Sequence, residues 1–94
     1  MDSNDKKQQD IKKKILFKTI GENINAKRTK TQKGINKFSF EYDIGNGLLS
    51  RLEKGKTDTK ISTLWKLANA FDIPLSEIIK EIENKLPQDF NFYE

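Results

Sequence analysis

The chain has 94 residues, of which 34% are hydrophobic and 34% are charged, and it carries no cysteine and no histidine. This length suits one domain with a small core, because a second core would leave too few apolar residues for either. The missing residue types exclude disulfides, Cys or His zinc ligands, thiol nucleophiles and a histidine general base, so the composition disfavours most enzyme classes.

Neither a secretion signal nor a membrane span is indicated. The first 14 residues, MDSNDKKQQDIKKK, carry one apolar side chain after the initiator Met, unlike a signal peptide. No apolar run approaches the ~20 residues that a membrane span needs. We therefore expect an intracellular protein without a membrane partner.

Charge is divided unevenly along the chain. Residues 1–66 hold 16 Lys and Arg against 8 Asp and Glu, whereas residues 67–94 hold 2 against 6. A segregated basic region is typical of proteins that bind nucleic acid, because Lys and Arg near phosphates release condensed counterions. A solvated lysine-rich surface is the alternative at this point.

The N-terminal third predicts an arm followed by a helix. Residues 1–14 are polar and basic, so we expect a flexible basic arm, with helix starting between Ile11 and Ile15. Apolar residues then recur at intervals of three and four and predict a helix that ends near Arg28 to Lys30.

A second and a third helix are predicted in close succession. Asn36 can cap a short helix over 37–43. A turn at 44–47 follows, where glycine and asparagine tolerate positive φ. The next helix spans 46–54 and ends at Gly55, a suitable C-terminal cap.

Two further helices complete the predicted bundle. A wide apolar stripe predicts a helix over Ile61 to Phe71, and Pro74 is placed to start a fifth helix that Pro87 ends. The predicted core comprises Phe38, Leu49, Leu52, Leu64, Trp65, Leu67, Ala68, Ile73 and Ile78. We divide the chain into the arm, a main domain over 15–80, and a helix-five extension with an aromatic tail over 81–94. Either this tail folds back over the last helical turns or a second subunit covers them.

The two short helices around the tight turn form a helix-turn-helix pattern. Together with Ile24 and Arg28, the stretches KFSFEYDIGNGLLSRLEKG and ISTLWKLANAFDIPLSEI resemble the Cro and phage-repressor type of DNA-binding domain, the XRE family. The resemblance covers about residues 15–80. It implies an all-α, compact five-helix bundle of the lambda-repressor-like type that binds operator DNA as a dimer, with its third helix in the major groove.

The base-reading positions of that family fall on Asn46, Gly47, Leu48 and Arg51. Arg51 could fork onto guanine, Asn46 could pair with an adenine edge, and Leu48 could contact a thymine methyl group. Gly47 offers no side chain, so this recognition helix has few side chains that can contact base edges.

The resemblance also implies roles outside base reading. Glu53 is expected to pair with Arg28, and a phosphate contact by Arg28 is a compatible alternative. Lys54, Lys56 and Lys60 are expected to contact the DNA sugar-phosphate backbone, although they could also be ordinary surface lysines. Asn36 and Lys37 are weaker substitutes for a phosphate-contacting glutamine that the family often has.

These observations predict a sequence-specific, repressor-like transcriptional regulator that binds double-stranded DNA, acts as a homodimer, and is not an enzyme. No cofactor, metal or small-molecule ligand is expected. The location expected is the cytoplasm of a bacterium, associated with the nucleoid, with the gene bacterial or phage-encoded. The sequence does not choose between repressor, activator and antitoxin. The alternative is a protein-interaction module or antitoxin-like partner protein with a degenerate recognition helix, which Gly47 and Leu48 motivate.

Overall fold

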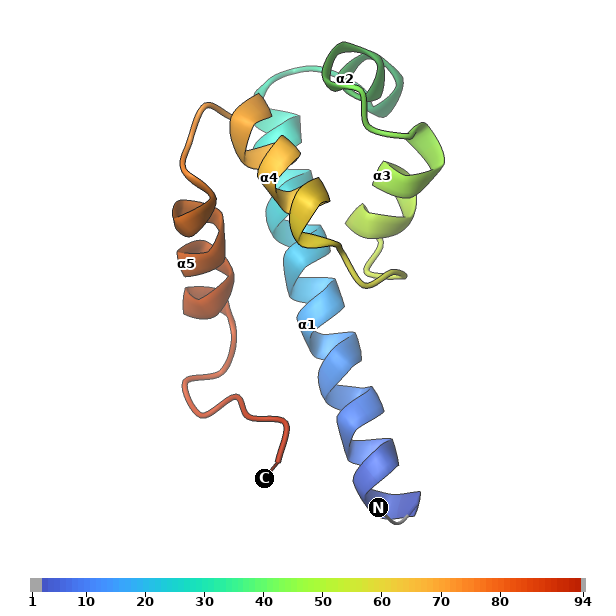
Figure 1. The fold of residues 1–94 in the computed structure, drawn as a ribbon, viewed down its shortest axis with the longest axis vertical. Coiled ribbons are helices and arrows are strands. Elements are labelled where there is room, and N and C mark those ends of the chain that lie inside the picture. The colour runs from blue at the N-terminus through green and yellow to red at the C-terminus, as the bar shows by residue number, and fades with distance from the viewer. Residues whose placement is uncertain (1–2, 94) are drawn as a thin grey trace.

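Five helices follow one another along the part of the chain that the structure describes. The structure is a computed structural model that describes residues 3–93, with side chains from residue 6. The helices are α1 (Ser3–Lys30), α2 (Ile35–Tyr42), α3 (Asn46–Glu53), α4 (Ile61–Ala70) and α5 (Leu75–Lys85). In Figure 1, α1 runs along the length of the molecule, with α2, α3 and α4 gathered around its C-terminal half. The predicted all-α five-helix architecture is confirmed.

The first helix is longer than the sequence predicts. It begins at Ser3 and has 28 residues, so the predicted start between Ile11 and Ile15 is wrong. Residues 3–14, which we expected as a flexible basic arm, are helical; residues 1–2 lie outside the described chain. Segment 3–14 is rich in Lys and Gln and has no Gly or Pro, and extending a formed helix costs far less than nucleating one. A polar segment without apolar periodicity can therefore continue a helix that packing has already fixed.

The core lies where the C-terminal half of α1 meets the other four helices. Its buried apolar residues are Ile20, Ile24, Phe38, Ile44, Leu49, Leu52, Leu64, Leu67, Ala68, Ile78 and Ile82. The Phe38 ring packs against Tyr42 and Phe71, with centroids 4.7 and 5.4 Å apart. Seven of the nine predicted core residues are buried. Ile73 is only partly buried against the core.

The prediction for Trp65 is wrong, because its side chain is 55% exposed. Helix α4 turns Leu64, Leu67 and Ala68 toward the core, and the next position after Leu64 lies about 100° around the helix. Ile61, also part of the predicted stripe, is 59% exposed. The apolar stripe read from the sequence is thus wider than the face that α4 buries.

The turn between α2 and α3 differs in its details from the prediction. Gly34 caps α2, and Asn36 lies inside that helix instead of capping it. Positive φ occurs at Asp43, with φ 54°, while Gly45 has φ −53° in front of α3. Aspartate tolerates the left-handed region, so Asp43 can cap the C-terminal end of α2 without a glycine at that position.

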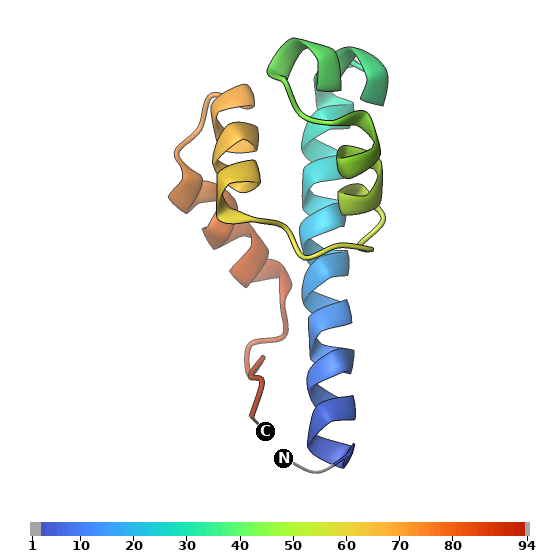
Figure 2. The ribbon, with the colours of Figure 1, turned by 45° about the vertical axis from the view of Figure 1, so that its right-hand side comes forward.

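After α5 the chain turns back toward α1. The aromatic rings of Phe90 and Phe92 lie 5.5 Å apart, edge to face, and the Lys12 ammonium donates a hydrogen bond to the Asn91 carbonyl. Figures 1 and 2 both show the C-terminal end beside the N-terminal half of α1. The tail therefore lies near α1; cover of the last turns of α5, by the tail or by a second subunit, stays a prediction.

Candidate nucleic-acid interface

Helix α3 divides cleanly into a buried and an outward side. Leu49 and Leu52 are buried to 0% and 1% exposure and fix the helix on the core. On the opposite side of α3, residues that lie one, four or five positions apart in the sequence share an outward face. That face carries Asn46, Gly47, Ser50, Arg51 and Lys54, of which all but the half-buried Ser50 are exposed.

An ion pair ties the end of α3 to α1. Arg28 Nε lies 2.7 Å from Glu53 Oε2 and Arg28 Nη2 lies 2.9 Å from Glu53 Oε1. The two side chains are only 12% and 5% exposed. Asn25 Nδ2 donates a further hydrogen bond of 2.8 Å to Glu53 Oε1. The expected pairing of Arg28 with Glu53 is confirmed.

The third guanidinium nitrogen of Arg28 also binds within the chain, because Nη1 donates to the Lys33 carbonyl at 2.8 Å. The hydrogen bond with Glu53 raises the pKa of Arg28 above its ordinary value, so the guanidinium keeps its charge. The geometry favours Arg28 as the residue that positions α3. A phosphate contact by Arg28 stays a prediction.

Close approach of the two helices accompanies this ion pair. A Cβ atom at Gly21 in α1 would lie 2.4 Å from the Leu52 carbonyl oxygen and 2.7 Å from that of Glu53. Only glycine therefore lets the α3 backbone come so near to α1. An apolar contact, a hydrogen-bonded ion pair and a close approach of the two backbones therefore fix α3, and with it the outward face, relative to the rest of the bundle.

The first turn of α3 has its own side-chain contacts. The Asn46 side-chain amide donates a hydrogen bond to the Asn36 side-chain oxygen, which links the outward sides of α2 and α3. A Cβ atom at Gly47 would lie 3.2 Å from Arg51 Nη1, so the guanidinium lies over the space that Gly47 leaves. All four predicted base-reading positions thus lie on α3.

Exposed lysines flank this face. Lys37 lies on α2, while Lys54, Lys56 and Lys60 lie at the end of α3 and in the loop before α4, and all four are exposed. The loop is fixed by backbone hydrogen bonds from Gly55 to Leu52 and from Lys56 to Arg51. Every residue predicted to contact the DNA backbone, apart from Arg28, therefore lies on α2, on α3 or in the adjoining loop.

A family model described as helix-turn-helix matches residues 24–78, more than half of the chain. The chain belongs to the XRE-type helix-turn-helix family. In the helix-turn-helix, α2 is the first helix and α3 the recognition helix. Family membership implies DNA as the partner, and the family is typically non-enzymatic. Searches among curated proteins and among solved structures gave no match.

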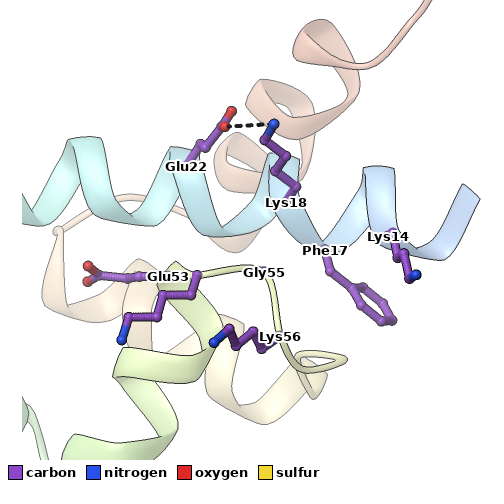
Figure 3. Close-up of a pocket in the computed structure, with 8 residues that line it drawn as sticks. Lys14, Phe17, Lys18, Glu22, Glu53, Gly55 and Lys56 are labelled. Atoms are coloured by element: carbon purple, nitrogen blue, oxygen red, sulfur yellow. Dashed lines mark ion pairs between the residues drawn. The ribbon is translucent and has the colours of Figure 1, made fainter. Parts of the chain in front are cut away.

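The helix-turn-helix has neighbours that the sequence did not indicate. An open pocket beside α3 is lined by Lys14, Phe17, Lys18, Glu22, Glu53, Lys54, Gly55 and Lys56 (Figure 3). Lys14 and Lys18 come from α1, and sequence reasoning missed them as candidates, because no sequence pattern shows which turn of α1 the α3–α4 loop contacts. Ser50 shares the outward side of α3 and was not among the predicted site residues, although its spacing of four from Asn46 and Lys54 indicates that position.

Within residues 3–93, no helix is both long and apolar enough to cross a membrane. The same part of the chain contains no group of three or more acidic side chains placed to hold a metal ion.

Proposed function

We propose that this protein is a sequence-specific transcriptional regulator of the repressor type, which inserts α3 into the major groove of DNA. The observation that carries the proposal is the outward face of α3, with Asn46 and Arg51 exposed on a helix that Arg28 and Glu53 lock to the bundle. Family membership supports DNA as the ligand. A rigidly held helix can present side chains to base edges in a fixed register.

The proposed readers have distinct roles. Arg51 forks onto guanine O6 and N7, and Asn46 pairs with an adenine edge. Leu48 is half-buried and offers at most an apolar contact with a thymine methyl group. Gly47 contributes space for the Arg51 guanidinium instead of a contact of its own.

The proposed phosphate contacts are the exposed residues Asn36, Lys37, Lys54, Lys56 and Lys60. Repression then follows from occupancy, since a bound protein excludes other proteins from the same DNA. The proposed mechanism needs neither a catalytic group nor a cofactor, and the place of action is the bacterial nucleoid.

An electrophoretic shift experiment tests DNA binding itself. The protein is titrated against a pool of random duplexes and an AT-rich duplex at ~50 mM and ~200 mM salt. We expect binding to both at the lower salt, because phosphate contacts dominate there, and enrichment of one sequence from the random pool at the higher salt. Absence of binding at ~50 mM salt would contradict the proposal.

One observation favours a second candidate function, a protein-interaction module. Phe40 on the outer side of α2 is 90% exposed, and aromatic side chains are enriched at protein interfaces relative to the rest of the surface. A chain that fails to bind any duplex at ~50 mM salt would support this second function.

The regulator is proposed to act as a homodimer, because DNA readers of this type meet two half-sites about one helical turn apart. We assign the contact to α5 and the tail, where Tyr93 is 85% exposed. A rival apolar surface lies on α4 at Ile61 and Trp65. In sedimentation, deletion of residues 87–94 should lower the dimer mass, whereas Trp65→Ser should not. The reverse result would move the contact to α4, and a monomeric wild type would overturn the homodimer.

A further inference from the structure

The N-terminal half of α1 lies outside the residues that the helix-turn-helix family model matches, which begin at 24. Residues 6–18 carry six lysines and one aspartate. Lys7, Lys14 and Lys18 follow at intervals of seven and four, which places them on one face of the helix, and all three are exposed. This part of α1 is therefore a basic rod that the family's own DNA contacts do not explain.

The basic rod meets the DNA-facing loop at a defined point. A Cβ atom at Gly55 would lie 2.8 Å from the Lys18 Cα atom, and Gly55 has φ 70°. The loop backbone thus rests directly on the backbone of α1. As a result Lys54 and Lys56 from the loop and Lys14 and Lys18 from α1 line a single pocket (Figure 3).

Little negative charge offsets these four ammonium groups. Glu53 lines the same pocket, but its oxygens accept hydrogen bonds from Arg28 and Asn25. Glu22 lies 4.0 Å from Lys18, and both side chains are largely exposed, so this pair contributes little. Lysines from the end of the recognition helix and from α1 therefore line the same pocket, with the Lys18 side chain turned toward Glu22 (Figure 3).

We propose that the N-terminal half of α1, through Lys7, Lys14 and Lys18, binds the DNA backbone beyond the base pairs that α3 reads. This inference rests on the proposed function. From Lys18 to Lys7 the helix rises about 16 Å at ~1.5 Å per residue, the length of about five base pairs at ~3.4 Å. The partner is duplex DNA that continues past the half-site, because the surface adjoins the loop that grips the backbone at the half-site.

The experiment compares two duplexes that carry the same selected site. The short duplex ends close to the site, and the long one continues about ten base pairs on each side. The variant Lys7→Gln/Lys14→Gln removes two charges and keeps good helix formers. Lys80→Gln, on the exposed surface of α5, is the control for loss of charge alone. Sedimentation verifies that this control keeps the mass of wild type in solution, and thermal unfolding verifies that each variant is folded.

For the double variant we expect weaker binding to the long duplex, by roughly fivefold to tenfold per lysine at ~0.1 M salt, and a salt slope smaller by about two. Its affinity for the short duplex should match that of wild type, and Lys80→Gln should match wild type on both. Equal binding of wild type and double variant to the long duplex would overturn the proposed DNA contact by α1, but not the proposed function. Failure of the wild type to bind either duplex would overturn the proposed function together with it.

Discussion

Arg28 and Glu53 join the end of α1 to the last residue of α3 through two hydrogen bonds of 2.7 and 2.9 Å. Both side chains are largely withdrawn from solvent, so neither charge is compensated by water if its partner is removed. The pair fixes the C-terminal end of the recognition helix, while Leu49 and Leu52 fix its buried side. The direction in which α3 presents its outward face depends on this contact.

Glu53→Ala should lower the free energy of unfolding by about 2–4 kcal/mol, because it leaves the Arg28 guanidinium poorly solvated and unpaired. Urea denaturation followed by circular dichroism measures the loss. Glu22→Ala is the matched control, since Glu22 is exposed and its partner Lys18 is 4.0 Å away; its effect should stay within about 0.5 kcal/mol. Equal losses for the two variants would show that the Arg28–Glu53 pair does not stabilise the bundle.

Two helical glycines should respond in opposite ways to alanine. Gly21→Ala places a Cβ atom 2.4 Å from a backbone oxygen of α3, so α1 and α3 must separate, at a cost of about 1–3 kcal/mol. Gly47→Ala meets only the flexible end of Arg51, at 3.2 Å, and should stabilise α3 by about 0.5 kcal/mol through helix propensity. Urea denaturation measures whether each substitution raises or lowers the free energy of unfolding. A stabilising Gly21→Ala would contradict the close packing of α1 on α3.

Acid should weaken the contact between α1 and α5. Burial raises the pKa of Glu81, but hydrogen bonds from Lys27 and Asn23 and the charges of Lys27 and Lys85 together hold it below its ordinary 4.5. Lys27 Nζ lies 2.9 Å from Glu81 Oε2. Since the folded state has the lower pKa, the stabilisation by Glu81 is complete above pH ~4.5 and is lost as the pH falls through the folded-state value.

The corresponding measurement is the free energy of unfolding at pH ~7 and pH ~3. Glu81→Gln should lose less stability between these two pH values than wild type does, because the substituted amide takes up no proton. Glu83→Gln, at an exposed position of the same helix, should keep the wild-type difference. An unchanged acid response of Glu81→Gln would show that the network around Glu81 does not contribute to stability.

Much of the architecture could be predicted because the apolar spacing and the turn residues are local signals. The third helix was predicted over 46–54 and spans Asn46–Glu53, and the partner of Arg28 followed from the family resemblance. The exposure of Trp65 could not be predicted, because apolar residues occupy two adjoining faces of α4 and packing against the other helices decides which face is buried. The start of α1 was missed because polar residues can extend an existing helix without apolar spacing.

The candidate site was predicted less completely than the fold. The recognition helix and its flanking lysines follow from the family resemblance. The cluster of Lys14 and Lys18 with Lys54 and Lys56 depends on the loop that rests on α1 at Gly55. Such a contact between segments more than 30 residues apart has no signature in the sequence.

Base readout by α3 is tested most directly by measuring the affinity of Arg51→Ala for the duplex that wild type selects, and for duplexes with each base pair of that site exchanged. Fluorescence anisotropy at fixed salt gives these affinities, and Lys80→Ala is the control. We predict that Arg51→Ala loses about 1–3 kcal/mol on the selected duplex and no longer distinguishes the base pair at one position, while the control keeps the wild-type pattern. An Arg51→Ala variant that retains both the affinity and the full sequence preference of wild type would contradict base reading by Arg51 on α3.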